Sequence, residues 1–170
     1  MERCSAERLI EIFTSQDWTK RSEAIKRIEK EKEVLKRYYE RAKLGKLGAW
    51  RRSPRGKLAL ILIYDQVPRV IFRDERAYAT DKLARELTRE LYESGEYRKL
   101  SDEEQLFAFL PFHHSERLEE QKIANRMFKR LYERNPKRFE WIYRASCEYV
   151  KIIAKHGAFP HRKKIPKRKR

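Results

Sequence analysis

Three polar segments of the sequence contain the side chains best suited to chemistry. The first runs from Asp65 to Arg73, follows the most apolar stretch of the chain, and combines a carboxylate, an amide and two arginines. An arginine presents a planar, permanently charged fork that binds carboxylates or phosphates through paired hydrogen bonds. Taken alone, this segment favours an internal ion pair that fixes a turn. The alternative is a site in which Arg69 or Arg73 receives an anionic ligand beside Asp65 and Gln66.

The second segment runs from His113 to Glu116 and precedes a helix that Ser115 is expected to cap, because serine is a preferred residue at that position. His114 would then stand near the free amide groups of a helix start, where anions are favoured. Glu116 is close enough in sequence to orient His114 as a general acid or base. A loop histidine beside a capping serine is the common structural alternative, and His113 is expected to be exposed.

The third segment runs from His156 to Arg162 and follows the last expected helix. Gly157 favours the left-handed backbone conformation that ends helices, and His161 and Arg162 come directly after the anchoring pair Phe159 and Pro160. No histidine pair has the one-turn helical spacing typical of zinc sites, so we expect no metal. The sequence also contains no phosphate-binding glycine loop, serine elbow or paired Cys-His motif, and we expect no cofactor.

The elements that position these segments are expected to be helices. Apolar residues recur with a helical period along almost the whole chain, which predicts an all-α fold of about seven helices in antiparallel pairs. One long helix is expected through Ile25 and Ala42. A helix over residues 57–64, apolar on every side, is expected at the centre of the core and to end at Pro68, which would place Asp65 in the unfavourable dipole of a helix C-terminus.

Several helix ends carry clear signals in the sequence. Ser5 is expected to cap the first helix, and the residues from Ser101 to Glu104 match a capping box. A helix over residues 81–94 is expected to end at Gly95, and the helix after Ser101 is expected to stop before Pro111.

The size and charge of the chain limit the possible classes of protein. Its 170 residues fit a single domain, expected over residues 1–161, followed by a basic tail over residues 162–170 in which seven of nine residues are Lys or Arg. The longest uninterrupted apolar run, Leu58 to Tyr64, is seven residues long, too short for the ~20 that span a bilayer. Because the first residues form no apolar signal core and the lone cysteines Cys4 and Cys147 suit a reducing compartment, we expect a cytoplasmic protein.

The formal net charge is +17, and +10 remains without the tail. A surplus of this size attracts polyanions such as RNA through counterion release. The alternative is a helical surface coated with charges of both signs, as in heat-adapted proteins.

Four motifs in order give the chain a family resemblance. They are Asp65-Gln66-x-Pro68-Arg69-x-x-Phe72-Arg73, Ala77-Tyr78-Ala79-x-Asp81, Leu110-Pro111-Phe112-x-His114-Ser115-Glu116 and Gly157-x-Phe159-Pro160-His161-Arg162. From about Trp50 to Arg162 the chain resembles the bacterial and archaeal family known as domain of unknown function 924. The resemblance implies an all-helical fold like tetratricopeptide-type superhelices, and it implies no particular reaction. The chain departs from the family pattern at four positions, namely Val70, Tyr149, Ala158 and Lys163.

Three hypotheses for function follow, and the sequence indicates no oligomeric state. In the first, the three segments surround one solvent-accessible cavity that catalyses hydrolysis or transfer on an anionic or phosphorylated substrate. Its catalytic residues would be His114, Glu116 and Asp65, and its ligand-binding residues would be Gln66, Arg69, Arg73, Ser115, His161 and Arg162. In the second, the same residues form a structural ion network, while the basic surface and tail bind RNA or an acidic protein. In the third, the chain is a helical adaptor that grips a peptide.

Overall fold

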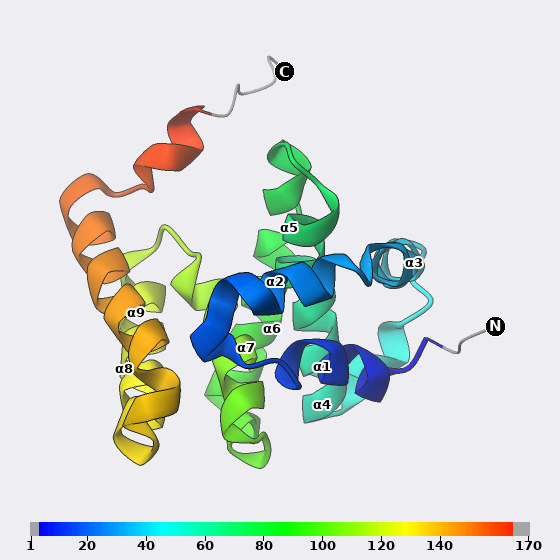
Figure 1. Ribbon diagram of the computed structural model, residues 1–170, viewed down its shortest axis with the longest axis horizontal. Coiled ribbons are helices and arrows are strands. Elements are labelled where there is room, and N and C mark those ends of the chain that lie inside the picture. Colours follow the sequence, from blue (N-terminus) through cyan, green and yellow to red (C-terminus); the bar gives the residue numbers. More distant parts are fainter. Residues whose placement is uncertain (1–3, 165–170) are drawn as a thin grey trace. The chain divides into compact units, whose positions relative to one another are not determined.

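The protein is all-α, as the helical period predicts. The computed structural model describes residues 4–164, with the side chains of 163 and 164 excepted, and contains no β-strand among them (Figure 1). The chain divides into two compact units, Met1–Pro111 and Phe112–Arg170, with the boundary in the last turn of helix α7. A single domain over residues 1–161 stays a prediction, as does the tetratricopeptide-like arrangement. Most of the expected basic tail lies outside the described residues.

The first unit consists of short and medium helices joined by tight turns. Its helices are α1 (Ala6–Thr14), α2 (Arg21–Glu29), α3 (Lys32–Lys43), α4 (Pro54–Ile61), α5 (Val67–Ile71), α6 (Asp81–Ser94) and α7 (Asp102–His113), whose last two residues belong to the second unit. The expected capping signals are confirmed. Ser5 accepts a hydrogen bond from the Arg8 amide, and Gly95 ends α6 with a left-handed backbone at φ 75°.

The capping box at the start of α7 is also confirmed. The Glu104 amide donates to Ser101 Oγ at 3.2 Å, and the Ser101 amide donates to Glu104 Oε1 at 3.1 Å. Each side chain thus satisfies an amide that the helix itself leaves without a partner.

Helix α4 lies at the centre of the core of the first unit, as expected. All six residues from Leu58 to Ile63 are buried, so this stretch is covered on every side. Phe13 of α1 and Phe107 of α7 pack edge to face with ring centroids 5.8 Å apart. Burial of large apolar side chains of this kind supplies the main favourable free energy of folding.

The helix boundaries expected between Ile25 and Ala42 and at Pro111 are wrong, and the described residues contain more helices than the seven expected. The long helix expected through Ile25 and Ala42 is two helices, α2 and α3. The break falls within residues 29–33, which are all charged, so no apolar side chain holds that turn against the core. Helix α7 does not stop before Pro111 but continues to His113. Pro111 cannot donate to the carbonyl of Phe107, four residues before it, but only two helical residues follow, so α7 loses a single backbone bond.

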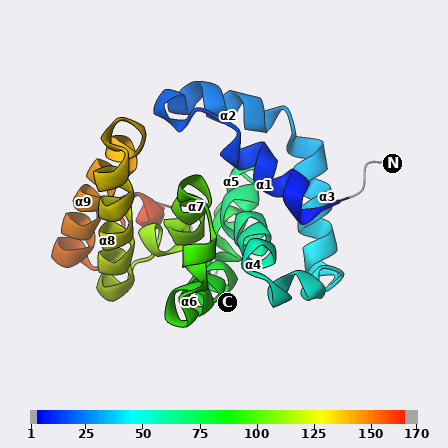
Figure 2. The ribbon, with the colours of Figure 1, turned by 90° about the horizontal axis from the view of Figure 1, so that it is seen from below.

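The second unit is built on the helix pair α8 (Leu118–Arg134) and α9 (Pro136–His156), which lie side by side in both ribbon views (Figures 1 and 2). A single residue, Asn135, joins them, and its side chain accepts a hydrogen bond from the Arg138 amide at 3.2 Å. Phe128, Phe139 and Phe159 are each at most 2% exposed and form the core of this unit.

No helix within residues 4–164 is long and apolar enough to cross a membrane.

A close backbone approach in the first unit yields a testable prediction about stability. A Cβ atom added at Gly56 of α4 would lie 1.9 Å from the Trp50 carbonyl oxygen, whereas one added at Gly48 would meet nothing within 4 Å. Because backbone cannot move aside cheaply, we expect Gly56→Ala to lower the free energy of unfolding by about 1–3 kcal/mol. The control Gly48→Ala should change it by no more than about 0.5 kcal/mol. Urea unfolding measures both, and equal stabilities would show that the approach at Gly56 relaxes without cost.

Candidate functional site

Asp65 and Gln66 lie in a π-helical turn, Leu62–Gln66, between α4 and α5. The Val67 amide donates to the Leu62 carbonyl, five residues before it, in place of the usual four. Turns of this kind are rare within helices and are frequent at functional sites. The expected helix end at Pro68 is therefore wrong, and so is the position of Asp65 at a helix C-terminus, because the helix continues as α5 to Ile71.

Two side chains donate hydrogen bonds to backbone carbonyls of this irregular helix. Pro68 has no amide hydrogen to donate to the carbonyl of Tyr64, four residues before it. The Thr80 hydroxyl donates to that carbonyl at 2.6 Å, and Arg69 Nη1 donates to the Asp65 carbonyl at 2.5 Å. Thr80 thus satisfies the carbonyl that Pro68 leaves without its usual donor, and Arg69 adds a bond to the next carbonyl.

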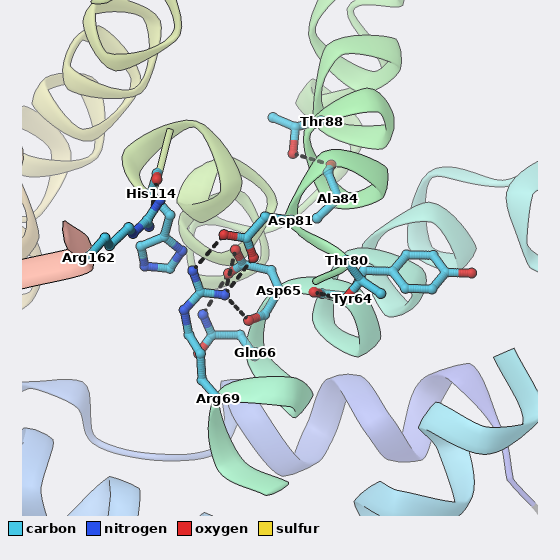
Figure 3. Close-up of polar contacts among 10 residues, drawn as sticks. All are labelled: Tyr64, Asp65, Gln66, Arg69, Thr80, Asp81, Ala84, Thr88, His114 and Arg162. Atoms are coloured by element: carbon cyan, nitrogen blue, oxygen red, sulfur yellow. Dashed lines mark hydrogen bonds and ion pairs between the residues drawn. The ribbon is translucent and has the colours of Figure 1, made fainter. Parts of the chain in front are cut away.

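Arg69 is the centre of a network with two carboxylates (Figure 3). Its Nη1 and Nη2 donate to Asp81 Oδ1 and Oδ2 at 2.9 and 3.0 Å, which is the bidentate geometry that arginine forms with a carboxylate. Arg69 Nη1 also lies 3.5 Å from Asp65 Oδ1, and Gln66 Nε2 donates to Asp65 Oδ2 at 2.7 Å. The structure thus brings together three predicted site residues of the first segment and adds Asp81.

Burial makes these contacts strong. Asp65 is 0% and Asp81 is 7% exposed, and the Arg69 guanidinium lies 5.2 Å from the centre of the Tyr78 ring. Burial by itself lowers the pKa of Arg69, but Asp65 and Asp81 more than offset that effect, so its pKa is raised above the ordinary value. The guanidinium is therefore permanently charged and both of its terminal nitrogens are engaged by carboxylates. These contacts support the internal ion pair as the role of Arg69.

The structure separates Arg73 from this network. Arg73 Nη2 donates to Glu29 Oε1 of α2 at 3.2 Å, and its side chain is 76% exposed. Asp81 is the residue that sequence reasoning missed. Asp81 is the last residue of the second motif. Acidic residues are common in the first turn of a helix, so its position did not mark it as a site residue.

In the second unit, the second and third polar segments meet. Glu116 Oε2 accepts a hydrogen bond from the Phe159 amide at 2.6 Å, across 43 positions of sequence. Arg162 Nη2 donates to the His114 carbonyl at 2.8 Å, across 48 positions (Figure 3). Glu116 and Arg162 therefore hold the segment that follows α9 against the loop that precedes α8.

Ser115 belongs to a buried cluster and does not cap α8. Its hydroxyl donates to Glu120 Oε1 at 2.6 Å and accepts from the Arg117 amide at 3.1 Å, and the N-cap of α8 is Arg117. Gln121 Nε2 donates to the carbonyls of His113 and Ser115 at 2.6 and 2.7 Å. Ser115 is 1% exposed, so its contacts fix the loop. The position expected for His114 at a helix start is wrong as well, since His114 directly follows the last residue of α7.

His113 and His161 differ from each other in exposure. His113 was expected to be exposed and is buried, at 4%, because its ring stacks on Tyr149 with centroids 4.1 Å apart. His161 is exposed, with its ring 5.7 Å from that of Phe159. Tyr149, one of the departures from the family pattern, thus has a packing role in this chain.

Taken separately, each unit contains a polar cluster whose contacts are mainly structural. No group of three or more His, Cys, Asp or Glu side chains is placed to hold a metal ion in the described part of the chain. A cavity shared by all three polar segments stays a prediction, because the first segment lies in one unit and the other two lie in the other.

Fold and clusters together define an all-α protein in which an arginine joins two buried aspartates around an interrupted helix. The chain belongs to the family described as "Bacterial protein of unknown function (DUF924)", whose model matches residues 11–170. The resemblance stated from the four motifs is confirmed, and the match extends to the N-terminal helices. A solved structure of a protein of unknown function from Agrobacterium tumefaciens is similar, with 25% sequence identity, a TM-score of 0.72, and coverage of 94% of this chain and 88% of that one. A comparison with curated proteins gave no match.

The Arg69 network gives a prediction about stability. Asp81→Asn leaves a neutral amide against a buried guanidinium, and we expect it to lower the free energy of unfolding by about 3 kcal/mol or more. Asp74→Asn is the matched control, because Asp74 also contacts an arginine, Arg76, through two nitrogens but on the exposed surface. The control should be far milder, since solvent screens exposed pairs. Similar decreases in urea unfolding would contradict the central role of Asp81.

The contact between Glu116 and Phe159 gives a second prediction, about local order. We expect Glu116→Ala to speed hydrogen exchange of the Phe159 amide by about tenfold or more, because the amide no longer has its charged acceptor. Glu116→Gln keeps an oxygen acceptor at the same place and should retain most of the protection. Exchange measured by NMR distinguishes the variants, and unchanged protection in Glu116→Ala would mean that other contacts hold the segment.

Proposed function

We propose that this protein binds RNA without catalysing a reaction, and that its second unit supplies most of the binding surface. The observation that carries the proposal is the uneven charge of the two units. The second unit has 18 Lys and Arg residues against six Glu and no Asp, a net charge of +12. The first unit has 25 Lys and Arg against 20 Asp and Glu, a net charge of +5, although it is almost twice as long.

This distribution distinguishes between two explanations of the basic composition, which are a surface coated with charges of both signs and a surface that binds a polyanion. A surface with charges of both signs fits the first unit, where acidic residues nearly balance basic ones. It does not describe the second unit, where three basic residues stand for every acidic one. An unbalanced surplus destabilises a compact fold through self-repulsion, and a polyanionic partner relieves that repulsion on binding.

The contacts of the predicted catalytic residues support a non-catalytic role. Asp65 is buried beside Arg69, and Glu116 holds a backbone amide. Arg69, which the enzyme hypothesis requires for the substrate, is occupied by Asp81. Hydrolysis or transfer on an anionic substrate stays a prediction, because the described contacts of Asp65, Arg69 and Glu116 are made with the protein itself.

The proposal is tested by the salt dependence of RNA binding. We expect a labelled RNA to bind the full chain with an affinity that falls steeply between about 50 and 200 mM salt, because phosphate contacts release counterions. Deleting residues 163–170, which carry six of the basic residues, should weaken binding and reduce the slope by roughly 0.7 units for each phosphate that is no longer neutralised. A second variant with Gln at those six positions controls for chain length. No binding by the full chain even at low salt would refute the proposal.

A further inference from the structure

We propose that the outer face of α8 is the surface on which a single RNA strand lies, an inference that rests on the proposed function. The surface consists of four basic residues of α8, here called the α8 stripe: Lys122, Arg126, Lys129 and Arg130. Its ligand is the phosphodiester backbone, which it would bind through charge rather than through base recognition.

The spacing of the stripe places its charges on one side of the helix. Positions separated by four, seven and eight residues fall within an arc of about 100° in an α-helix of 3.6 residues per turn. The stripe spans about 12 Å along the axis, at 1.5 Å per residue. Since a nucleic-acid strand in a duplex carries one phosphate per about 3.4 Å of axis, this length corresponds to about three or four phosphates.

Burial fixes which side of α8 the stripe occupies. All four side chains are exposed, whereas Ile123, Ala124, Met127, Phe128 and Leu131 of the same helix are buried. Packing therefore holds the helix with its basic face directed to solvent, and binding requires no rearrangement of the core.

The charges of the stripe are available for a ligand. Within the described residues, none of the four side chains takes part in a hydrogen bond or an ion pair. Helix α9 differs, because its exposed Arg144 and Lys151 pair with Glu140 at 2.7 Å and Glu148 at 3.2 Å. A ligand on α9 would have to displace these acids, whereas one on α8 would not.

Acidic residues limit the length of the stripe. Glu119 and Glu133 are exposed one turn before and one turn after it, and α8 has no acidic residue between Lys122 and Arg130. The remaining acid at this end, Glu120, is buried against Ser115. A short favourable region bounded by acids suits a flexible single strand, because a stiff duplex that follows the helix axis would meet both glutamates.

The test compares two variants that remove equal charge from different helices. The first replaces the four residues of the α8 stripe with Gln. The second replaces Arg21, Lys26, Arg27 and Lys30 of α2 and its C-cap with Gln, and these are also two Arg and two Lys, exposed and without an ion pair in the described residues. In α2, Arg21 lies on the opposite side of the helix from the other three, and Glu23 stands one turn before Lys26 and Arg27. Both variants have the same net charge, so the general attraction for a polyanion is matched.

Fluorescence anisotropy with a labelled oligouridylate, titrated between about 50 and 200 mM salt, measures affinity and salt slope. We expect the slope of the α8 variant to fall by about three units, since each of four phosphates neutralised on a single strand contributes about 0.7. The α2 variant should keep most of the slope. Circular dichroism on both variants checks that the helices are retained.

The remaining outcomes each overturn or support a defined part of the inference. If the full chain binds and the two variants weaken binding equally, the α8 stripe is refuted while the proposed function stands. If the full chain does not bind, both are refuted. If polyglutamate competes as well as oligouridylate at equal charge, the partner is an acidic polypeptide and the RNA assignment is wrong. Equal affinity for oligothymidylate supports backbone recognition, whereas a clear preference for the DNA strand would overturn RNA as the ligand.

Discussion

The bidentate contact between Arg69 and Asp81 is the interaction on which the first unit depends most. It places one guanidinium between two buried carboxylates, and it ties the start of α6 to the helix that runs from α4 through α5. A buried carboxylate without such a partner costs several kcal/mol in desolvation. Arg69 offsets that cost for Asp81 directly and for Asp65 in part, while Gln66 supplies a further donor to Asp65.

The same contacts explain why a proline is tolerated in the middle of a core helix. Pro68 removes one amide donor, and the π-helical turn before it shifts the hydrogen-bond register. The hydroxyl of Thr80 satisfies the Tyr64 carbonyl, which Pro68 leaves without its usual donor, and the guanidinium of Arg69 bonds the neighbouring Asp65 carbonyl. Residues that sequence reasoning assigned to ligand binding therefore have a structural use, because an apolar core cannot leave backbone carbonyls without donors.

The sequence predicted those parts of the fold that depend on neighbouring residues. The helix caps at Ser5, Ser101 and Gly95 are set by local backbone bonds, and each is confirmed. The errors near the candidate site involve tertiary partners. Thr80 sustains the helix through Pro68, and His113 is buried because Tyr149, from a distant helix, stacks on it. Within the candidate site, the second and third segments do contact each other in the second unit. No pattern in the sequence indicated that Asp81 would be the partner of Arg69.

The charge of the second unit is the feature that local structure does not require. Helices α8 and α9 bury their apolar faces against each other and need no surplus of cations for that packing. On α9, two exposed cations are paired with glutamates one helical turn away, an arrangement that modestly stabilises a helix. On α8, four cations share one face with no acid between them and no ion pair in the described residues, and their mutual repulsion makes the isolated helix less stable. A stability argument accounts for the pattern on α9 but not for the pattern on α8, where the proposed RNA ligand would offset the repulsion on binding.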